Sequence, residues 1–392
     1  MDPFEIREEA EITAAGVRRI RSGHLWIYAG DVKREPEGAA PAIVKVIDAH
    51  RNALGYAFYS RVSQIRLRMF TRVADAPTVD LLRARVQKAI GRRAALVRPD
   101  SACRLVFGEA DLLPSIVVDR YAGCLVLQTL SAGADAVKSQ LVDILRDALN
   151  PAGILERNDV KTRRFEGLEE LHGPLWGTIP ERVEIAENEI RFLVDLSAGQ
   201  KTGFFLDQRE NRIAARAYAA GRGLDCFTNT GAFALHFAGR CASILAVDVS
   251  GDALGQARRN AELNGIANIE FREANAFDLL RELERAGEKY DLVCLDPPAF
   301  AKNRASLPGA LAGYKEINLR AMKLLRPEGI LVTSSCSFHL SEANFEEILH
   351  GAARDAHRYV QILERRGQAS DHPILTGMPE THYLKCFILR VL

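Results

Sequence analysis

Short apolar runs alternate with amphipathic segments along the second half of the chain, from about residue 190 onward. The apolar runs predict strands at 223–227, 243–248, 268–272, 290–295, 329–334, 358–364 and 383–391. The amphipathic segments predict helices near 207–219, 231–239, 251–263, 275–286, 310–325 and 341–353. This alternation is typical of an α/β fold with a mostly parallel, doubly wound sheet. Seven strands with a β-rich ending favour the variant in which the final strand runs antiparallel to the rest.

The first half of the chain has a different pattern. Residues 1–73 read as a small β-rich module, with strands at 44–47, 53–59 and 63–70, and residues 78–97 read as an amphipathic helix. From 103 to 187 the order is strand, strand, helix, strand, strand, with its helix at 135–149. We therefore predict three domains: 1–73, then 74–189 with a linker helix and a small α+β unit, and 190–392.

The stretch from Gly223 to Phe233 predicts a buried strand, a tight turn and the start of a helix. The next apolar run ends in Asp248, which in this kind of sheet is the place for an acid that binds a ribose diol. The turn lacks the G-x-G-x-x-G pattern that pyrophosphate binding requires. A ligand with a ribose but no phosphates fits better, and S-adenosylmethionine is the common one. A βαβ core without a ligand is the alternative.

Two further stretches carry candidate chemistry. The fourth strand of this half ends in Asp296-Pro297-Pro298, where the prolines fix the backbone and could hold a carboxylate or carbonyl toward the amino group of a base. The fifth strand ends near Cys336, whose thiolate could add to carbon 6 of a cytosine and make carbon 5 able to accept a methyl group. Each stretch also has a purely structural interpretation. Asp296-Pro297-Pro298 could simply end a strand, and Cys336 could be a small buried residue.

Charge is distributed unevenly, although the net charge is only +1. Between Arg51 and Arg104, twelve Lys or Arg residues face three acids, a local excess of nine that leaves about −8 elsewhere. Such a field can attract a polyanion, and a solvated helix face is the equal alternative. In Ser63–Phe70 the alternation predicts an open face carrying Arg66 and Arg68, which could lie along a phosphate backbone. Trp26 and Tyr28 could stack on bases, but their alternation favours a half-buried strand.

Other features exclude some classes of protein. The seven cysteines form no C-x-x-C pair, so we expect neither a zinc site nor a disulfide framework, and no metal. No apolar run is long enough to cross a bilayer, and the start of the chain lacks the pattern of a signal peptide. A cytoplasmic location is the expectation. The oligomeric state stays open, with a homodimer among the options.

The motifs together resemble one family. The sequence is similar to the bacterial large-subunit (23S) ribosomal RNA cytosine-5 methyltransferases with an N-terminal PUA domain, over nearly the full chain. The resemblance rests on these stretches: Gly23–Ile27, Ser63–Arg66, Gly203–Arg209, Asp225–Phe227, Thr230-Gly231, Asp248, Asp296–Phe300, Ser335–Ser337, Asp371–Pro373 and Tyr383–Lys385. It implies a PUA domain that binds RNA, a small central domain and a seven-stranded Rossmann-like class I domain that binds S-adenosylmethionine.

The resemblance also implies roles for residues. Cys336 would be the nucleophile, Asp296, Pro297 and Pro298 would hold the base, and 23S ribosomal RNA would be the partner. The expected cofactor contacts are Phe205, Asp207, Arg209, Asp225, Cys226, Phe227, Thr230, Gly231, Asp248, Val249, Ser250, Asn275, Ala276 and Asp296. The expected RNA contacts are Arg18, Arg66, Arg68, Lys201 and Lys302.

Two positions depart from the family pattern. Asn275 stands where the family usually has an acid beside the adenine, and Ala299 stands where many RNA cytosine-5 enzymes carry a second cysteine. Close relatives of this catalytic domain modify guanine instead, so a guanine-directed methyltransferase with the same pocket is an alternative. A second alternative, of another class, is an RNA-binding ribosome-assembly factor without catalysis.

Overall fold

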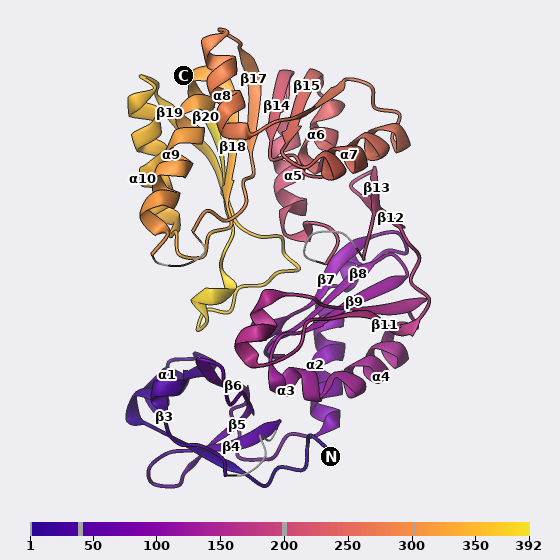
Figure 1. Cartoon of the computed structure of the whole chain (residues 1–392), viewed down its shortest axis with the longest axis vertical. Helices are drawn as coiled ribbons and strands as arrows, with labels where there is room; N and C mark the ends of the chain where they lie inside the picture. The colour runs from indigo at the N-terminus through magenta and orange to yellow at the C-terminus, as the bar shows by residue number, and fades with distance from the viewer. Residues whose placement is uncertain (1, 38–41, 198–201, 302, 304) are drawn as a thin grey trace. The chain divides into compact units, whose positions relative to one another are not determined.

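A computed structural model describes residues 2–37, 42–197, 202–301, 303 and 305–392 (Figure 1). Its contacts divide the chain into two compact units, each described here by itself. Unit 1 comprises residues 1–185, 194–206 and 371–381, and unit 2 comprises 186–193, 207–370 and 382–392. The predicted division into three domains is a finer one, and it stays a prediction.

Unit 1 begins with a six-stranded sheet in the order β2-β6-β5-β4-β1-β3. Its strands are β1 (Glu9–Ile12), β2 (Trp26–Tyr28), β3 (Val32–Arg34), β4 (Ile43–Ile47), β5 (Ala53–Tyr59) and β6 (Ile65–Thr71). Helix α1 (Ala14–Arg21) lies between β1 and β2 and is capped by Thr13, whose hydroxyl accepts from the Gly16 amide. Strands β4 to β6 confirm the three strands predicted here, but β6 is buried on both sides from Leu67 to Thr71, so the predicted alternation is wrong there.

A five-stranded sheet follows, in the order β11-β10-β9-β8-β7. Its strands are β7 (Ala102–Phe107), β8 (Ile116–Tyr121), β9 (Cys124–Thr129), β10 (Gly153–Asn158) and β11 (Leu171–Gly177). The helices are α2 (Val79–Arg92), α3 (Ala132–Ala136) and α4 (Lys138–Leu149). The predictions missed β7 and β11. Strand β11 carries Pro174 between two glycines, a composition that only an edge strand tolerates, and its pairing with β10 defines it.

A short segment from far along the chain completes unit 1. The backbone amide of Arg104 donates to the Asp371 carboxylate at 2.9 Å, and the Arg93 guanidinium donates to the Asp371 carbonyl at 2.8 Å. The Leu25 amide lies 3.1 Å from the Met378 sulfur. Asp371, which is fully buried, thus fixes residues 371–381 between two parts of this unit.

Unit 2 contains a seven-stranded sheet in the order β16-β15-β14-β17-β18-β20-β19. Its strands are β14 (Gly221–Cys226), β15 (Cys241–Asp248), β16 (Ile269–Glu273), β17 (Tyr290–Leu295), β18 (Leu325–Ser335), β19 (Val360–Arg366) and β20 (Lys385–Val391). Strand β20 pairs antiparallel with both β18 and β19, while β14 to β18 are parallel, as predicted. The separate hairpin of β12 (Val183–Glu187) and β13 (Ile190–Val194) was also predicted.

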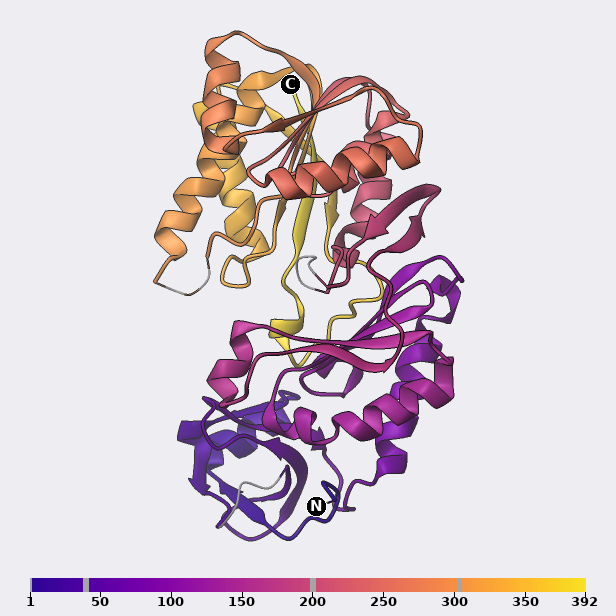
Figure 2. The same cartoon turned by 45° about the vertical axis from the view of Figure 1, so that its right-hand side comes forward.

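Helices cover both faces of this sheet (Figures 1 and 2). One face carries α8 (Ala276–Arg285), α9 (Leu307–Leu324) and α10 (Glu342–Asp355), and the other α5 (Arg209–Ala217), α6 (Ala232–Ala238) and α7 (Gly251–Leu263). Two apolar cores result, one around Tyr314 and Phe345 and one around Phe233 and Phe237. Because β14 to β18 are parallel, their carboxyl ends share one edge of the sheet, where ligands bind in such folds.

Candidate active site

The turn after β14 is braced from inside the core. The Asp225 side chain is 1% exposed and accepts from the Thr228 hydroxyl at 2.6 Å and the Ala234 amide at 3.1 Å. Burial raises the pKa of Asp225 to about 7. Cys226 is fully buried in the apolar core. Both side chains face the interior and support the turn, and the expected cofactor contacts of these two residues stay predictions.

The backbone of this turn adopts uncommon conformations. Phe227, Asn229 and Gly231 have φ values of 64°, 50° and 82°. Left-handed conformations of bulky residues store strain, which is concentrated at functional sites. A Cβ atom on Gly231 would lie 3.2 Å from the Ala257 Cβ of α7, so tight helix packing favours glycine here in addition to the positive φ. The half-buried Thr230 and Phe227 remain at the carboxyl edge of the sheet.

Asp248 ends β15 at the same edge. Its carboxylate oxygens accept from the backbone amides of Asn229, at 2.9 Å, and Ser250, at 3.0 Å. Ser250 caps α7 through its hydroxyl, and Val249 is 64% exposed. A half-buried carboxylate held in this way keeps further acceptor capacity. It can accept the two hydroxyl donors of a ribose diol.

Asn275 follows β16 and caps α8. Its Oδ1 accepts from the Phe277 amide at 2.9 Å, and its side chain is exposed. Ala276 is buried in the core, so only its backbone is available to a ligand. The exposed amide of Asn275 can hydrogen-bond a purine edge, as an acid could at the same position.

Asp296 follows β17 and is held by a short polar network. Gln208 donates to its Oδ1 at 2.8 Å, and Asn211 donates to Gln208 at 2.6 Å. Gln208 and Asn211 are at most 2% exposed, so they fix the orientation of the Asp296 carboxylate. Pro297 is buried and Pro298 is exposed. Sequence reasoning did not assign the two amides a role, although Gln208 lies within the Gly203–Arg209 motif and Asn211 follows it closely.

Cys336 follows β18, the neighbour of β17. Its Sγ lies 3.9 Å from the Pro297 carbonyl oxygen, and it is half-buried, whereas the other six cysteines are buried. Ser337 joins the two segments, since its hydroxyl lies 3.1 Å from the Ala301 amide and 2.9 Å from the Tyr314 hydroxyl. The sequence placed Cys336 and Asp296 in one site, and the structure brings their segments together.

Three expected cofactor contacts lie at or just before the start of α5, and their surroundings differ. Asp207 is buried and accepts from the Tyr383 hydroxyl at 2.6 Å, while α5 begins at Arg209 after Gln208. Arg209 forms an ion pair with Glu210 at 3.2 Å and is largely buried. Phe205 is half-buried and belongs to unit 1. The expected cofactor contacts of these three residues stay predictions.

The predicted RNA-contacting residues differ in their exposure and in their ion pairs. Arg18 is exposed on α1. Arg66 is half-buried and pairs with Glu35 at 3.0 Å. Arg68 is 6% exposed and pairs with Glu166 at 2.7 Å, so its expected place on an open face is wrong. The 3₁₀ turn at residues 161–166 supplies Glu166 to that side of β6, and the alternation within β6 alone could not indicate this partner. Lys201 and Lys302 lie outside the described residues.

The basic stretch between residues 51 and 104 is largely neutralised. At least seven of its twelve cations form ion pairs, and each partner is an acid from outside the stretch: Arg51, Arg66, Arg68, Arg83, Arg92, Arg93 and Arg104. The local excess in the sequence therefore overstates the free positive charge.

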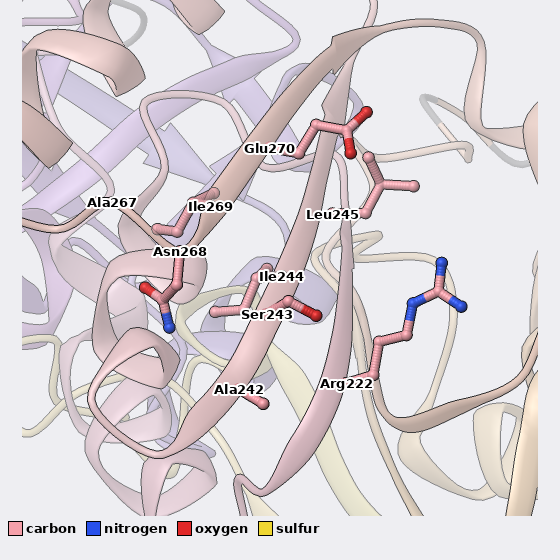
Figure 3. A pocket seen from close by; sticks show the side chains of 9 residues that line it. All are labelled: Arg222, Ala242, Ser243, Ile244, Leu245, Ala267, Asn268, Ile269 and Glu270. Atoms are coloured by element: carbon pink, nitrogen blue, oxygen red, sulfur yellow. The ribbon is translucent and has the colours of Figure 1, made fainter.

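A surface hollow of about 350 Å³ lies elsewhere in unit 2 (Figure 3). Ala242, Ser243 and Arg222 line it near the amino ends of β14 and β15, away from the candidate site. Arg222 already pairs with Glu288 and lies over the Tyr290 ring. Among the described residues we find neither a cluster suited to a metal ion nor a helix long and apolar enough to span a bilayer.

Comparison with known families agrees with this geometry. Residues 157–383 match a family model described as S-adenosylmethionine-dependent methyltransferase, and residues 11–72 match a PUA-like domain. The fold and the strand-end site define a class I methyltransferase, and the predicted fold class is confirmed.

Curated relatives narrow the assignment. "Ribosomal RNA large subunit methyltransferase I" of Tolumonas auensis is 44% identical over 94% of this chain and 96% of its own. The protein of that name from Photobacterium profundum is 42% identical over 95% and 97%. The chain belongs to this methyltransferase family, so the resemblance found in the sequence is confirmed.

Solved structures support the fold. A methyltransferase from Streptococcus mutans has a TM-score of 0.83 at 19% identity, covering 98% of this chain and all of the other. A methyltransferase solved with SAH has a TM-score of 0.84 at 20% identity, with the same coverage.

The cofactor of this family is S-adenosylmethionine, and the strand-end residues fit it. Asp248 offers acceptors for a ribose diol, and Asn275 offers an exposed amide for the adenine. The turn from Phe227 to Gly231 presents backbone and no cluster of glycines for phosphates. The donor and acceptor set thus suits a nucleoside without phosphates.

Proposed function

We propose that this protein transfers a methyl group from S-adenosylmethionine to carbon 5 of a cytosine in large-subunit (23S) ribosomal RNA. The names of its relatives support the RNA class. The observation that carries the choice of base is Cys336, the half-buried cysteine beside the Asp296-Pro297 turn. In this proposal the protein acts in the cytoplasm.

Cys336 supplies the nucleophile. Its thiolate bonds to carbon 6 of cytosine, and the carbon 5–carbon 6 electron pair moves so that carbon 5 becomes nucleophilic. S-adenosylmethionine, when bound, supplies an electrophilic methyl group to that carbon. Loss of the carbon 5 proton then returns the electron pair to the ring and expels the Cys336 thiolate.

Asp296 orients the base. Its carboxylate is held by Gln208 and can accept from the amino group of cytosine, which is a donor. Ala299 has no proton acceptor in its side chain, so another group must remove the carbon 5 proton. Pro297 and Pro298 keep the turn rigid, because their rings restrict φ.

Cofactor contacts follow the carboxyl edge. We assign Asp248 to the ribose, Asn275 to the adenine and the Thr230-Gly231 turn to the methionine end. Val249 and Ser250 line the same edge beyond β15. Asp225 acts indirectly, since its carboxyl group fixes Thr228 and thereby the turn.

Unit 1 binds the RNA, with Arg18 and an exposed loop as contacts. The 3₁₀ turn at residues 161–166 presents Phe165, which is 74% exposed, beside the exposed Lys161 and Arg164. Its neighbours are anchored, because Arg163 bonds the Glu169 carbonyl at 2.7 Å and Glu166 pairs with Arg68. A fixed aromatic ring beside cations suits an unpaired base.

The test is transfer of labelled methyl to unmodified large-subunit RNA, followed by nucleoside analysis. Wild type should give 5-methylcytidine, and Cys336→Ala should abolish it while keeping cofactor binding. Cys241→Ala, at the amino end of β15, is the matched control. Label in guanosine, or activity that survives in Cys336→Ala, would reject the nucleophile. RNA binding without any label would favour the assembly factor.

A further inference from the structure

A buried lysine lies beside the proposed nucleophile. Lys385 is 3% exposed, and its Nζ donates to the carbonyls of Ser337 and Tyr383, each at 2.7 Å. An ammonium has three donors, so these two carbonyls leave one available. Ser337 is the next residue after Cys336, so the ammonium lies beside the segment that carries the thiol, and a Cys336 thiolate raises the pKa of Lys385.

The sheet topology explains this placement. Strand β20 runs antiparallel to β18, so its first residue lies at the edge where β18 ends. Lys385 pairs in register with Ser335, the last residue of β18. The following loop is fixed through Ser337 by Ala301 and Tyr314. The thiol and the ammonium are therefore held by one rigid set of contacts.

We propose that Lys385 is a positioning residue that stabilises the Cys336 thiolate, both before it attacks the base and when it is expelled. The ammonium keeps its own proton and makes no bond to RNA. It lowers the energy of the charged sulfur, as a nearby cation does for reactive thiols in general. This proposal rests on the proposed role of Cys336 as nucleophile.

The surrounding groups agree with this role. Burial lowers the pKa of Lys385 to about 8, and the negative charges of Cys336 and Glu342 oppose the shift. Lys385 is therefore charged below about pH 8 and loses its charge above it. Tyr314 lies on α9 nearby, and burial raises its pKa, so it stays neutral over the same range. Among these groups, Lys385 carries the positive charge.

Alkylation of Cys336 by iodoacetamide tests the proposal without RNA or methyl transfer. The full-length chain is labelled across pH 6–10, and the modified residue is located by mass spectrometry. The other six cysteines are buried, so Cys336 should react first. Lys385→Met should move the half-maximal pH up by about one unit, which slows labelling at pH 7 about tenfold. Lys385→Arg should retain most of the wild-type profile because it keeps the charge.

Controls separate the charge from folding. Lys315→Met removes a half-buried lysine of α9 that pairs with Asp355, and its labelling profile should match wild type. Each variant is first checked for cofactor binding. An unchanged profile in folded Lys385→Met would overturn the proposal; if that variant does not fold, a raised midpoint in Lys385→Arg, which keeps the positive charge over this pH range, would do so. Retained methyl transfer by Cys336→Ala would instead reject the proposed function and leave the alkylation result standing.

Discussion

The ion pair between Arg68 and Glu166 separates a structural role from an RNA-binding role. The Arg68 and Glu166 side chains are 7% and 4% exposed, and two of their atom pairs lie at 2.7 and 3.3 Å. Arg68→Met leaves the Glu166 carboxylate buried without its cation. Breaking a buried pair in this way costs about 3–5 kcal/mol. In a unit of this size, each kcal/mol lowers the melting temperature by about 2–4 °C, so the expected loss is on the order of 10 °C.

The assay combines thermal unfolding with RNA binding. Arg68→Met/Glu166→Leu should recover much of the lost stability, because it removes both charges together. At a temperature where each protein is folded, the dependence of RNA affinity on salt should be equal in wild type and Arg68→Met. Arg18→Met should retain wild-type stability and reduce the salt slope by about 1. An Arg68→Met protein with unchanged melting and a reduced salt slope would refute the structural assignment.

Three other changes test the site and the core. Asp248→Ala should weaken S-adenosylmethionine binding at least about tenfold in calorimetry, since good hydrogen bonds to a charged group contribute about 1.5–3 kcal/mol; wild-type affinity would contradict the ribose assignment. Phe165→Ala should raise KM for RNA about tenfold through lost stacking, while Tyr359→Ala, which removes an 83% exposed ring, should not; equal effects would remove Phe165 from the RNA surface. Burial lowers the pKa of His236 to about 4, so the unfolded chain binds a proton that the folded chain does not between about pH 6.5 and 4. The free energy of unfolding measured in urea should therefore fall by on the order of 3 kcal/mol as the pH falls through that window. His236→Gln should show a weaker dependence of this free energy on pH. An equal dependence in the variant and wild type would contradict the assignment.

The sheet of unit 2 was predictable because each apolar run in it is short and bounded by helical signals. All seven strands were expected near their observed positions, and β20 is antiparallel as expected. The hydrophobic periodicity of the sequence is a weak signal for edge strands, because an edge strand pairs with only one neighbour and tolerates proline and glycine. Strand β11 is such a case, because its proline and glycines hide the pattern and its pairing with β10 forms it.

Side-chain surroundings were less predictable than elements. Asp225 was expected to contact the cofactor because of the family resemblance, and Arg68 was expected to contact RNA because the alternation of its strand predicted an open face. Both are buried: Asp225 accepts from Thr228 and Ala234 in the turn and helix that follow its strand, and Arg68 pairs with Glu166, which lies far along the chain. A charge count along the sequence cannot include acids that come from elsewhere in the chain. The charge count of residues 51–104 overestimated the free positive charge for this reason.

The convergence at Cys336 shows which parts of a site follow from strand direction. Strands β17 and β18 are parallel neighbours, so Asp296 and Cys336, which follow them, must share an edge of the sheet. The sequence therefore sufficed to place them together. Lys385 reaches the same edge because β20 runs the opposite way and begins where β18 ends. A rule that searches only the carboxyl ends of strands misses such a residue, so in sheets of this kind the amino end of the antiparallel strand should be searched as well.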